Sequence, residues 1–197
     1  MSTFSIASIV EGHGEVDALP ILVRRIGARI AGVESLNLPR PFRVPRDRLL
    51  KDDVLETTVV AVGKRLGDDP GGVLVLIDAD DDCPAALGPE LMERAQGALP
   101  RGKVVVVLAN MEYEAWFLSC ATSLAGHRNL PSDLREPADP ESIRGTKEWL
   151  SRAMPSGKAY SSSVDQPALT ARMDLDLARS RSGSFDKLWR ALESLCS

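Results

Sequence analysis

Short apolar runs alternate along the chain with segments in which apolar residues recur at three- and four-residue steps. Three runs are nearly continuous and rich in β-branched residues, which is typical of parallel strands that are covered on both faces. They span residues 4–10, 73–77 and 104–109, and residues 41–44 form a weaker strand candidate. This pattern predicts the strands of a mostly parallel, buried sheet.

Helical spacing follows the first strand and recurs between the others. After Gly14, apolar residues repeat on one face of a predicted helix; they are Val16, Leu19, Val23, Ile26 and Ile30. Pro20 lies within this segment, and we place it in the first turn, where a missing N–H is tolerated. Residues 54–66 and 89–99 predict two further helices. The alternation of strand and helix favours an α/β domain of layered architecture.

The strand pattern stops near residue 124. Residues 127–140 are rich in Pro and Asp, which is typical of a loop or linker. Helices are expected over residues 141–153, 165–178 and 184–195, with a polar loop at 157–163. We therefore expect an α/β domain over residues 1–123 and a helical extension over residues 124–197, packed on it as one compact unit.

Composition narrows the class of protein. The chain has 197 residues, with 24 Lys and Arg against 28 Asp and Glu, so that the net charge is −4. This length suits one sizeable core, and the apolar content excludes a disordered chain. Net acidity argues against coating nucleic acid by bulk charge. It does not argue against an enzyme that acts on nucleic acid from a local acidic site.

Cysteine spacing and hydropathy indicate a cytoplasmic protein. Cys83, Cys120 and Cys196 are far apart and form no CxxC pair, which favours reduced thiols over a disulfide framework or a zinc site. No apolar run approaches the ~18 residues that a transmembrane helix needs. The first residues lack the basic region of a signal peptide, and their apolar run meets an acidic residue at Glu11.

Acidic residues follow each of the three clear strands. They are Glu11, Glu15, Asp78, Asp80, Glu112 and Glu114. Because ligands gather at the carboxyl ends of the strands in a parallel sheet, we expect these side chains to converge. Crowded carboxylates repel one another unless a cation lies among them, and oxygen ligands suit Mg²⁺ or Mn²⁺.

The spacing of the first two acidic groups suggests how they are used. Asp78 and Asp80 are two residues apart, so both can point to one side of the strand end. Glu11 and Glu15 are four apart with two glycines between them, which permits a tight strand-to-helix turn. Glu15 then falls in the first helical turn, where it could bind a second ion.

The third acidic group leaves two candidates open. Glu112 is closer to the strand end, whereas Glu114 lies in a predicted helix start at residues 113–118. A structural alternative exists for the acidic run after the second strand: it is a solvated loop, with Asp82 as a helix N-cap. Because acidic groups follow all three clear strands, the sequence favours a metal site over this structural alternative.

Three stretches that carry these acids resemble the Toprim domain of topoisomerases, bacterial primases and the overcoming-lysogenisation-defect nucleases. They are IVEGHGE at residues 9–15, LIDAD at 76–80 and ANMEYEAWFL at 109–118. The tail, with KAY at residues 158–160, DQP at 165–167 and SGSFDKL at 182–188, is similar to small stand-alone Toprim-like proteins. Such proteins are often encoded beside ATPases in suspected phage-defence or mobile loci.

The resemblance implies roles for individual residues. Glu11 would be a metal ligand or a general acid/base, and Asp78 and Asp80 would hold divalent metal. Glu15 resembles the extra acid of the two-metal nuclease branch, which implies two Mg²⁺ or Mn²⁺ ions. His13 stands where that branch often has Ser or Thr, and we expect it to shape the turn or face the substrate.

Basic residues could contact a phosphate-bearing substrate. Lys158 and Lys147 are the candidates for neutralising charge on the phosphate, and Lys158 is preferred because it lies in a polar loop. Arg43, Arg46 and Arg48 belong to a basic stretch that could track a nucleic-acid backbone. The alternatives are ordinary surface lysines and a solvated loop.

The leading functional hypothesis is a metal-dependent nuclease, with DNA favoured over RNA, working with an ATPase partner. Two alternatives remain: a non-catalytic metal- or phosphate-binding subunit that regulates such an ATPase, and a small-molecule phosphotransfer enzyme. A topoisomerase or a primase is excluded, because the chain has no room for the additional domains that these enzymes use.

Overall fold

The computed structural model describes residues 3–197, and in this part of the chain five strands form one sheet. All neighbouring strands are parallel, in the order β2-β1-β4-β5, and β3 also pairs with β1. Their bounds are β1 Thr3–Val10, β2 Ser35–Asn37, β3 Phe42–Arg43, β4 Gly71–Asp78 and β5 Lys103–Ala109. The predicted parallel α/β architecture is therefore confirmed.

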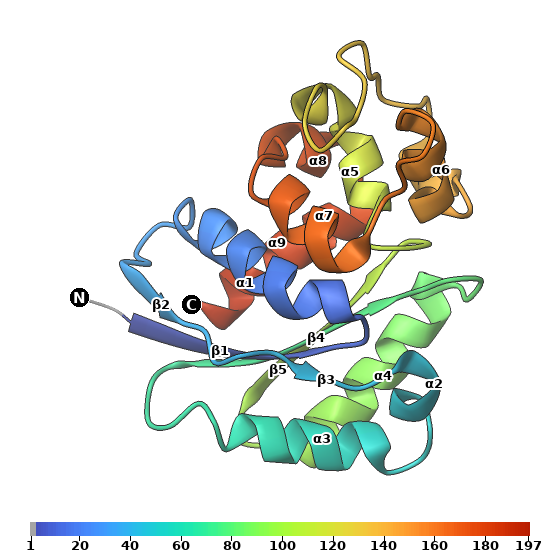
Figure 1. Ribbon diagram of the computed structural model, residues 1–197. Helices are drawn as coiled ribbons and strands as arrows, with labels where there is room; N and C mark the ends of the chain where they lie inside the picture. Colours follow the sequence, from blue (N-terminus) through green and yellow to red (C-terminus); the bar gives the residue numbers. More distant parts are fainter. Residues whose placement is uncertain (1–2) are drawn as a thin grey trace.

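Helices cover both faces of this sheet (Figure 1). On one face lie α2 Arg46–Leu49, α3 Val54–Gly63 and α4 Pro84–Ala98. The other face carries α1 His13–Gly27, α5 Ala115–Ser119, α6 Thr146–Ala153, α7 Ser162–Thr170, α8 Leu175–Arg181 and α9 Gly183–Leu195. Two short 3₁₀ turns, η1 Ala121–Leu124 and η2 Pro140–Ser142, lie in the chain between α5 and α6.

Burial on both faces explains why the strands are continuously apolar. Along β4, Leu74 and Leu76 join the core beneath α1 and the C-terminal helices. Their neighbours Val73, Val75 and Ile77 join the core on the side of α3 and α4. Side chains alternate between the faces of a strand, so a strand that is covered twice is mostly apolar, and the buried Ser5 and Ser8 of β1 are exceptions.

The C-terminal helices share a core with α1 and β5. The indole Nε1 of Trp116 donates a hydrogen bond of 2.8 Å to Ser184 Oγ at the start of α9. The guanidinium of Arg25 in α1 donates to the carbonyls of Thr170 (2.6 Å) and Met173 (2.8 Å). These contacts fasten the tail over the sheet and bring α6 and α7 near the carboxyl ends of the strands.

Several helix boundaries differ from those predicted. Helix α1 begins at His13, so Pro20 lies in its interior and not in the first turn. Helix α4 begins at Pro84, five residues before the predicted start, because Pro is well suited to a first helical position. The predicted helix over residues 165–178 is divided into α7 and α8, and the side chain of Asp174 caps the second of these.

Two further findings concern the state of the cysteines and the hydropathy of the helices. Within residues 3–197, all three cysteines are free thiols, and Cys83 is exposed whereas Cys120 and Cys196 are buried. In the same range, no helix combines the length and the apolar character that crossing a membrane requires.

Gly14 is required by the close approach of α7 to α1. A Cβ at this position would lie 2.4 Å from the backbone oxygen of Ser162 and 2.0 Å from Gln166 Oε1. We predict that Gly14→Ala lowers the free energy of unfolding by about 1–3 kcal/mol, because the backbone at Ser162 must shift. Thermal or urea unfolding measures this change.

Gly97→Ala is the matched control. Gly97 also lies in a helix, but apart from its chain neighbours and the backbone of its own helix, no atom of residues 3–197 lies within 4 Å of the position that a Cβ would take there. This variant should keep or raise stability by about 0.5–1 kcal/mol, because alanine is the better helix former. Equal effects of the two substitutions would contradict the packing argument.

Candidate metal centre

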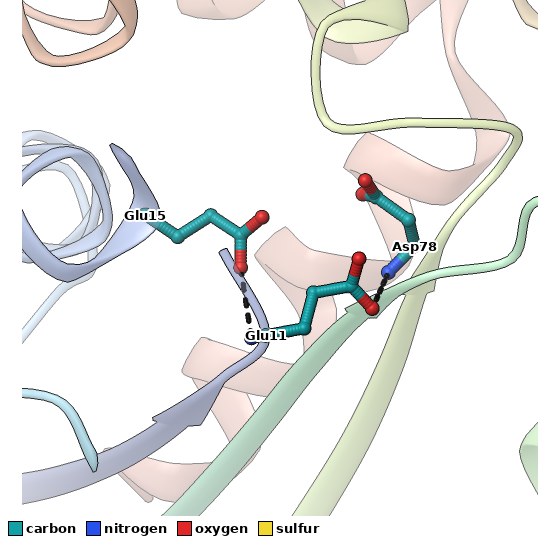
Figure 2. Close-up of side chains that lie close together, drawn as sticks. All are labelled: Glu11, Glu15 and Asp78. Atoms are coloured by element: carbon teal, nitrogen blue, oxygen red, sulfur yellow. Dashed lines mark hydrogen bonds between the residues drawn. The ribbon is translucent and has the colours of Figure 1, made fainter. Parts of the chain in front are cut away.

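Three carboxylates meet at the carboxyl end of the sheet. Glu11 is the first residue after β1, Asp78 is the last residue of β4, and Glu15 lies in the first turn of α1. β1 and β4 are neighbours, with Val10 opposite Leu76, and this register sets Glu11 beside Asp78. One oxygen from each of the three side chains lies within 4.8 Å of the others, so the group could hold a metal ion (Figure 2).

Backbone N–H groups orient these carboxylates. The N–H of Asp78 donates to Glu11 Oε2 at 3.2 Å, and the N–H of Tyr113 donates to Asp78 Oδ1 at 2.7 Å. Glu15 Oε2 accepts from the N–H groups of Glu11 (3.2 Å) and Gly12 (3.3 Å) (Figure 2). Each side chain thus uses one oxygen for the backbone and keeps its second oxygen for another ligand.

Without a bound cation, the ionised forms of these three carboxylates are electrostatically unfavourable. Burial, and secondarily repulsion by Glu11, raises the pKa of Glu15 to about 8. Burial also raises the pKa of Glu11 to about 7. The pKa of Asp78 is raised well above its ordinary value, first by burial and then by Glu15 and Glu11. A divalent cation would relieve this repulsion, and an all-carboxylate donor set fits Mg²⁺ or Mn²⁺.

Lys147, rather than Lys158, is the lysine at the site. Its Nζ lies 2.8 Å from Glu112 Oε1, 3.2 Å from Glu114 Oε2 and 3.8 Å from Asp78 Oδ2. Lys158 is exposed in the loop before α7, and it forms no ion pair within residues 3–197. The preference for Lys158 fails because a polar loop need not face the strand ends, whereas α6 begins directly over them.

Glu112 holds the start of α6 and lies outside the three-carboxylate group. Its Oε2 accepts hydrogen bonds from the N–H groups of Thr146 (2.8 Å) and Lys147 (3.4 Å), and also from the Thr146 hydroxyl. Burial by itself would raise the pKa of Glu112, but the hydrogen bonds from Lys147 and Thr146 lower it overall. This side chain therefore behaves as an ionised helix cap.

Glu114 is completely buried beside Lys147. The hydroxyl of Tyr160 donates to Glu114 Oε1 at 2.9 Å. Glu114 Oε2 lies within ion-pair distance of Lys147 Nζ, yet the direction of approach gives no hydrogen bond. Burial raises the pKa of this carboxyl group. Glu112 and Glu114 therefore both face the lysine, and neither joins Glu11, Glu15 and Asp78 in the three-carboxylate group.

Asp80 is not part of that group, although its negative charge adds to the effect of burial in raising the pKa of Glu11. The chain leaves β4 after Asp78, and Asp80 adopts a left-handed conformation with φ of 50° while its N–H donates to the carbonyl of Met111 at 2.9 Å. Its carboxylate is largely exposed and lies 3.6 Å from Arg46 Nε. The expectation that Asp78 and Asp80 point to one side assumed that the strand continues, and it ends between them.

Arg46 fastens the loop after β4. Its guanidinium donates to the carbonyls of Asp78 (3.0 Å) and Ala79 (3.3 Å) and forms an ion pair with Asp82. These contacts occupy the side chain that was expected to bind substrate. Asp82 is not the predicted helix cap, because α4 takes Cys83 as its N-cap.

The remaining predicted substrate residues are exposed around this edge. His13 begins α1, Arg43 lies in β3 opposite Val10, and Arg48 lies in α2. None of the three forms an ion pair within residues 3–197. Their role in binding substrate stays a prediction.

A cleft of about 410 Å³ opens beside Glu112 and Asp80, and none of Glu11, Glu15 and Asp78 is among the residues that line it. Its lining residues are Asp80, Asp81, Met111, Glu112, Arg144 and Gly145. Arg144 is largely exposed and pairs with Asp81. Sequence reasoning missed this arginine, because it precedes α6 in a segment without a recognisable motif.

Comparison with known proteins places the chain in a family. The profile described as "Domain of unknown function (DUF4276)" matches residues 10–193. The chain belongs to this family. The match includes every residue of the three-carboxylate group and Lys147. No curated protein matches the chain, and neither does any solved structure.

The raised pKa values predict how the metal-free protein responds to pH. Folded Glu11 and Glu15 bind protons up to about pH 7 and 8, whereas unfolded carboxyl groups release them near 4.5. The folded state therefore holds more protons across this window, and its stability falls as pH rises through it. We expect the unfolding free energy in EDTA to drop by up to about 5 kcal/mol, or about 10–20 °C in Tm, between pH 5.5 and 8.5.

Two controls identify the cause of this loss. Glu15→Gln should reduce the pH dependence, because its amide carries no charge at any pH. Saturating Mn²⁺ should stabilise the parent protein more at pH 8.5 than at 5.5, because metal competes with protons for the carboxylates. Parallel Tm–pH curves for the parent and Glu15→Gln would contradict the assignment.

Proposed function

We propose that the protein is a divalent-metal-dependent phosphodiesterase that cleaves nucleic acid, with DNA as the favoured substrate. The observation that carries this proposal is the convergence of Glu11, Glu15 and Asp78, each with one oxygen left for a ligand, at the carboxyl end of a parallel sheet. The resemblance of these segments to Toprim nucleases supports the same reaction.

The residues present suit hydrolysis of a phosphate ester. A Mg²⁺ or Mn²⁺ ion bound to the three carboxylates would supply Lewis acidity and a water of lowered pKa. The protein supplies fixed positions for these ligands through backbone N–H groups. Lys147 places a positive charge beside Asp78, where it can stabilise negative charge on a phosphate.

The surroundings offer a path for a phosphate-bearing chain. The cleft beside Glu112 is open to solvent and bordered by Arg144. Arg43 lies at the register of the last residue of β1, directly before Glu11. These side chains could contact phosphates on either side of the cleaved bond. An ATPase partner, which the resemblance implies, would act together with this site.

Cleavage assays with matched variants test the proposal. We expect purified protein to cleave plasmid DNA with Mg²⁺ or Mn²⁺, and Glu15→Gln and Asp78→Asn to reduce the rate more than about 100-fold, because each removes a charged ligand. Glu90→Gln is the control. Glu90 is exposed in α4, so its loss should leave the rate unchanged.

Other outcomes would select the alternatives. Binding of Mn²⁺ without cleavage of DNA or RNA, alone or with an ATPase encoded beside this protein, would refute the nuclease and favour a regulatory subunit. Turnover of nucleotides or simple phosphoesters without cleavage of polymers would favour a small-molecule phosphotransfer enzyme. Absence of Mn²⁺ binding would refute the metal-dependent nuclease.

A further inference from the structure

The two-ion arrangement that the Toprim resemblance implies would need a second set of carboxylates. The acids that remain near the site are Asp80, which is largely exposed and lies beside Arg46, and Glu112 and Glu114, which both already face the ammonium group of Lys147. This ammonium group also approaches Asp78, which belongs to the three-carboxylate group. Asp78 thus lies between the candidate ion position and a cation that the protein carries itself.

Lys147 has the surroundings of a bound cation. Its Nζ is surrounded by oxygens of three carboxylates at 2.8, 3.2 and 3.8 Å, from the end of β4 and the segment after β5. In two-metal sites a second ion commonly shares a carboxylate with the first. Asp78 occupies that shared position here, with Lys147 on its other side.

Glu114 is the most informative member of this second group. Its side chain is completely buried, and its Oε2 has no hydrogen-bond partner within residues 3–197. Tyr160 satisfies only Oε1. The charge on Lys147 therefore compensates an oxygen that no hydrogen bond satisfies, and an uncompensated buried carboxylate is costly.

The ammonium group is held in place by the start of α6. Glu112 Oε2 accepts the N–H groups of Thr146 and Lys147, while Glu112 Oε1 accepts the Lys147 Nζ proton at 2.8 Å. Withdrawing the lysine would remove a partner from Glu112, from Glu114 and from Asp78 together. An incoming ion would have to displace this fixed charge.

We propose that Lys147 takes the place of a second metal ion, so that the site binds one divalent cation and the protein supplies the other positive charge. This inference rests on the metal site of the proposed function and replaces its expected two ions by one ion and one lysine. A phosphate substrate would then meet a divalent cation and an ammonium group on opposite sides of Asp78.

Metal stoichiometry tests this proposal without reference to catalysis. Mn²⁺ titration followed by calorimetry and by electron paramagnetic resonance should give about one ion per chain for the parent protein. Lys147→Met removes the positive charge and keeps the length of the side chain, so Asp78, Glu112 and Glu114 become available to bind a second metal ion. We expect this variant to bind about two ions, with the spectrum of a coupled Mn²⁺ pair.

Two controls separate charge from other effects of the substitution. Lys147→Arg keeps a positive charge and should retain one ion. Lys158→Met removes an exposed lysine that contacts none of these carboxylates, and it should also retain one ion. Circular dichroism establishes that each variant is folded before it is titrated.

The outcomes distinguish this inference from the proposed function. A parent protein that binds two ions, or a folded Lys147→Met variant that still binds one, would overturn the inference and leave the nuclease proposal standing. A parent protein that binds no ion would overturn both. If Lys147→Met fails to fold, the parent stoichiometry decides: one ion with no coupled spectrum supports the proposal, and two ions reject it.

Discussion

The parallel pairing of β1 with β4 is the contact on which the site depends. It places the first residue after β1 beside the last residue of β4, and the N–H of Asp78 donates to Glu11 across this junction. Glu15 follows because α1 starts immediately after Gly12, whose N–H also orients its carboxylate. A shift of two residues in this register would separate Glu11 from Asp78 and dissolve the group.

The negative charges that are crowded at this junction are compensated by positively charged side chains from other parts of the chain. Arg46 arrives from α2 and binds the carbonyls after β4, whereas Lys147 arrives from α6 and faces Asp78, Glu112 and Glu114. The C-terminal helices are thus part of the site's electrostatics as well as of the core. The hydrogen bonds that Glu112 accepts from Thr146 and Lys147 at the start of α6 hold the ammonium group in position.

Compensation is incomplete around the three-carboxylate group. Glu11 and Glu15 retain pKa values near or above neutrality because burial and mutual repulsion outweigh the backbone hydrogen bonds. A divalent cation bound among these carboxylates would relieve this unfavourable electrostatic energy. Structural ion pairs elsewhere, such as Arg94 with Glu56 on α4 and α3, show the contrasting case, in which the pKa of the glutamate is lowered by its partner.

The sequence by itself determined four strands, the parallel α/β layering and the acidic residues that follow the strands, but it missed β2, a three-residue edge strand without a buried side chain. These features are local: apolar periodicity reports burial within a few residues, and parallel strands bring their ends to one edge. Glu11, Glu15 and Asp78 could be predicted on this basis. Asp80 could not be separated from Asp78, because the point at which β4 ends depends on its pairing with β5.

Only the tertiary structure decided which residues contact these acids. Local sequence favoured Lys158 over Lys147 because Lys158 lies in a polar loop, but the choice depends on where α6 begins relative to the strand ends. Glu112 and Glu114 likewise differ only through their contacts with Thr146 and Tyr160, which lie more than thirty residues further along the chain. Contacts over such separations are set by packing of the whole tail, and local sequence patterns do not encode them.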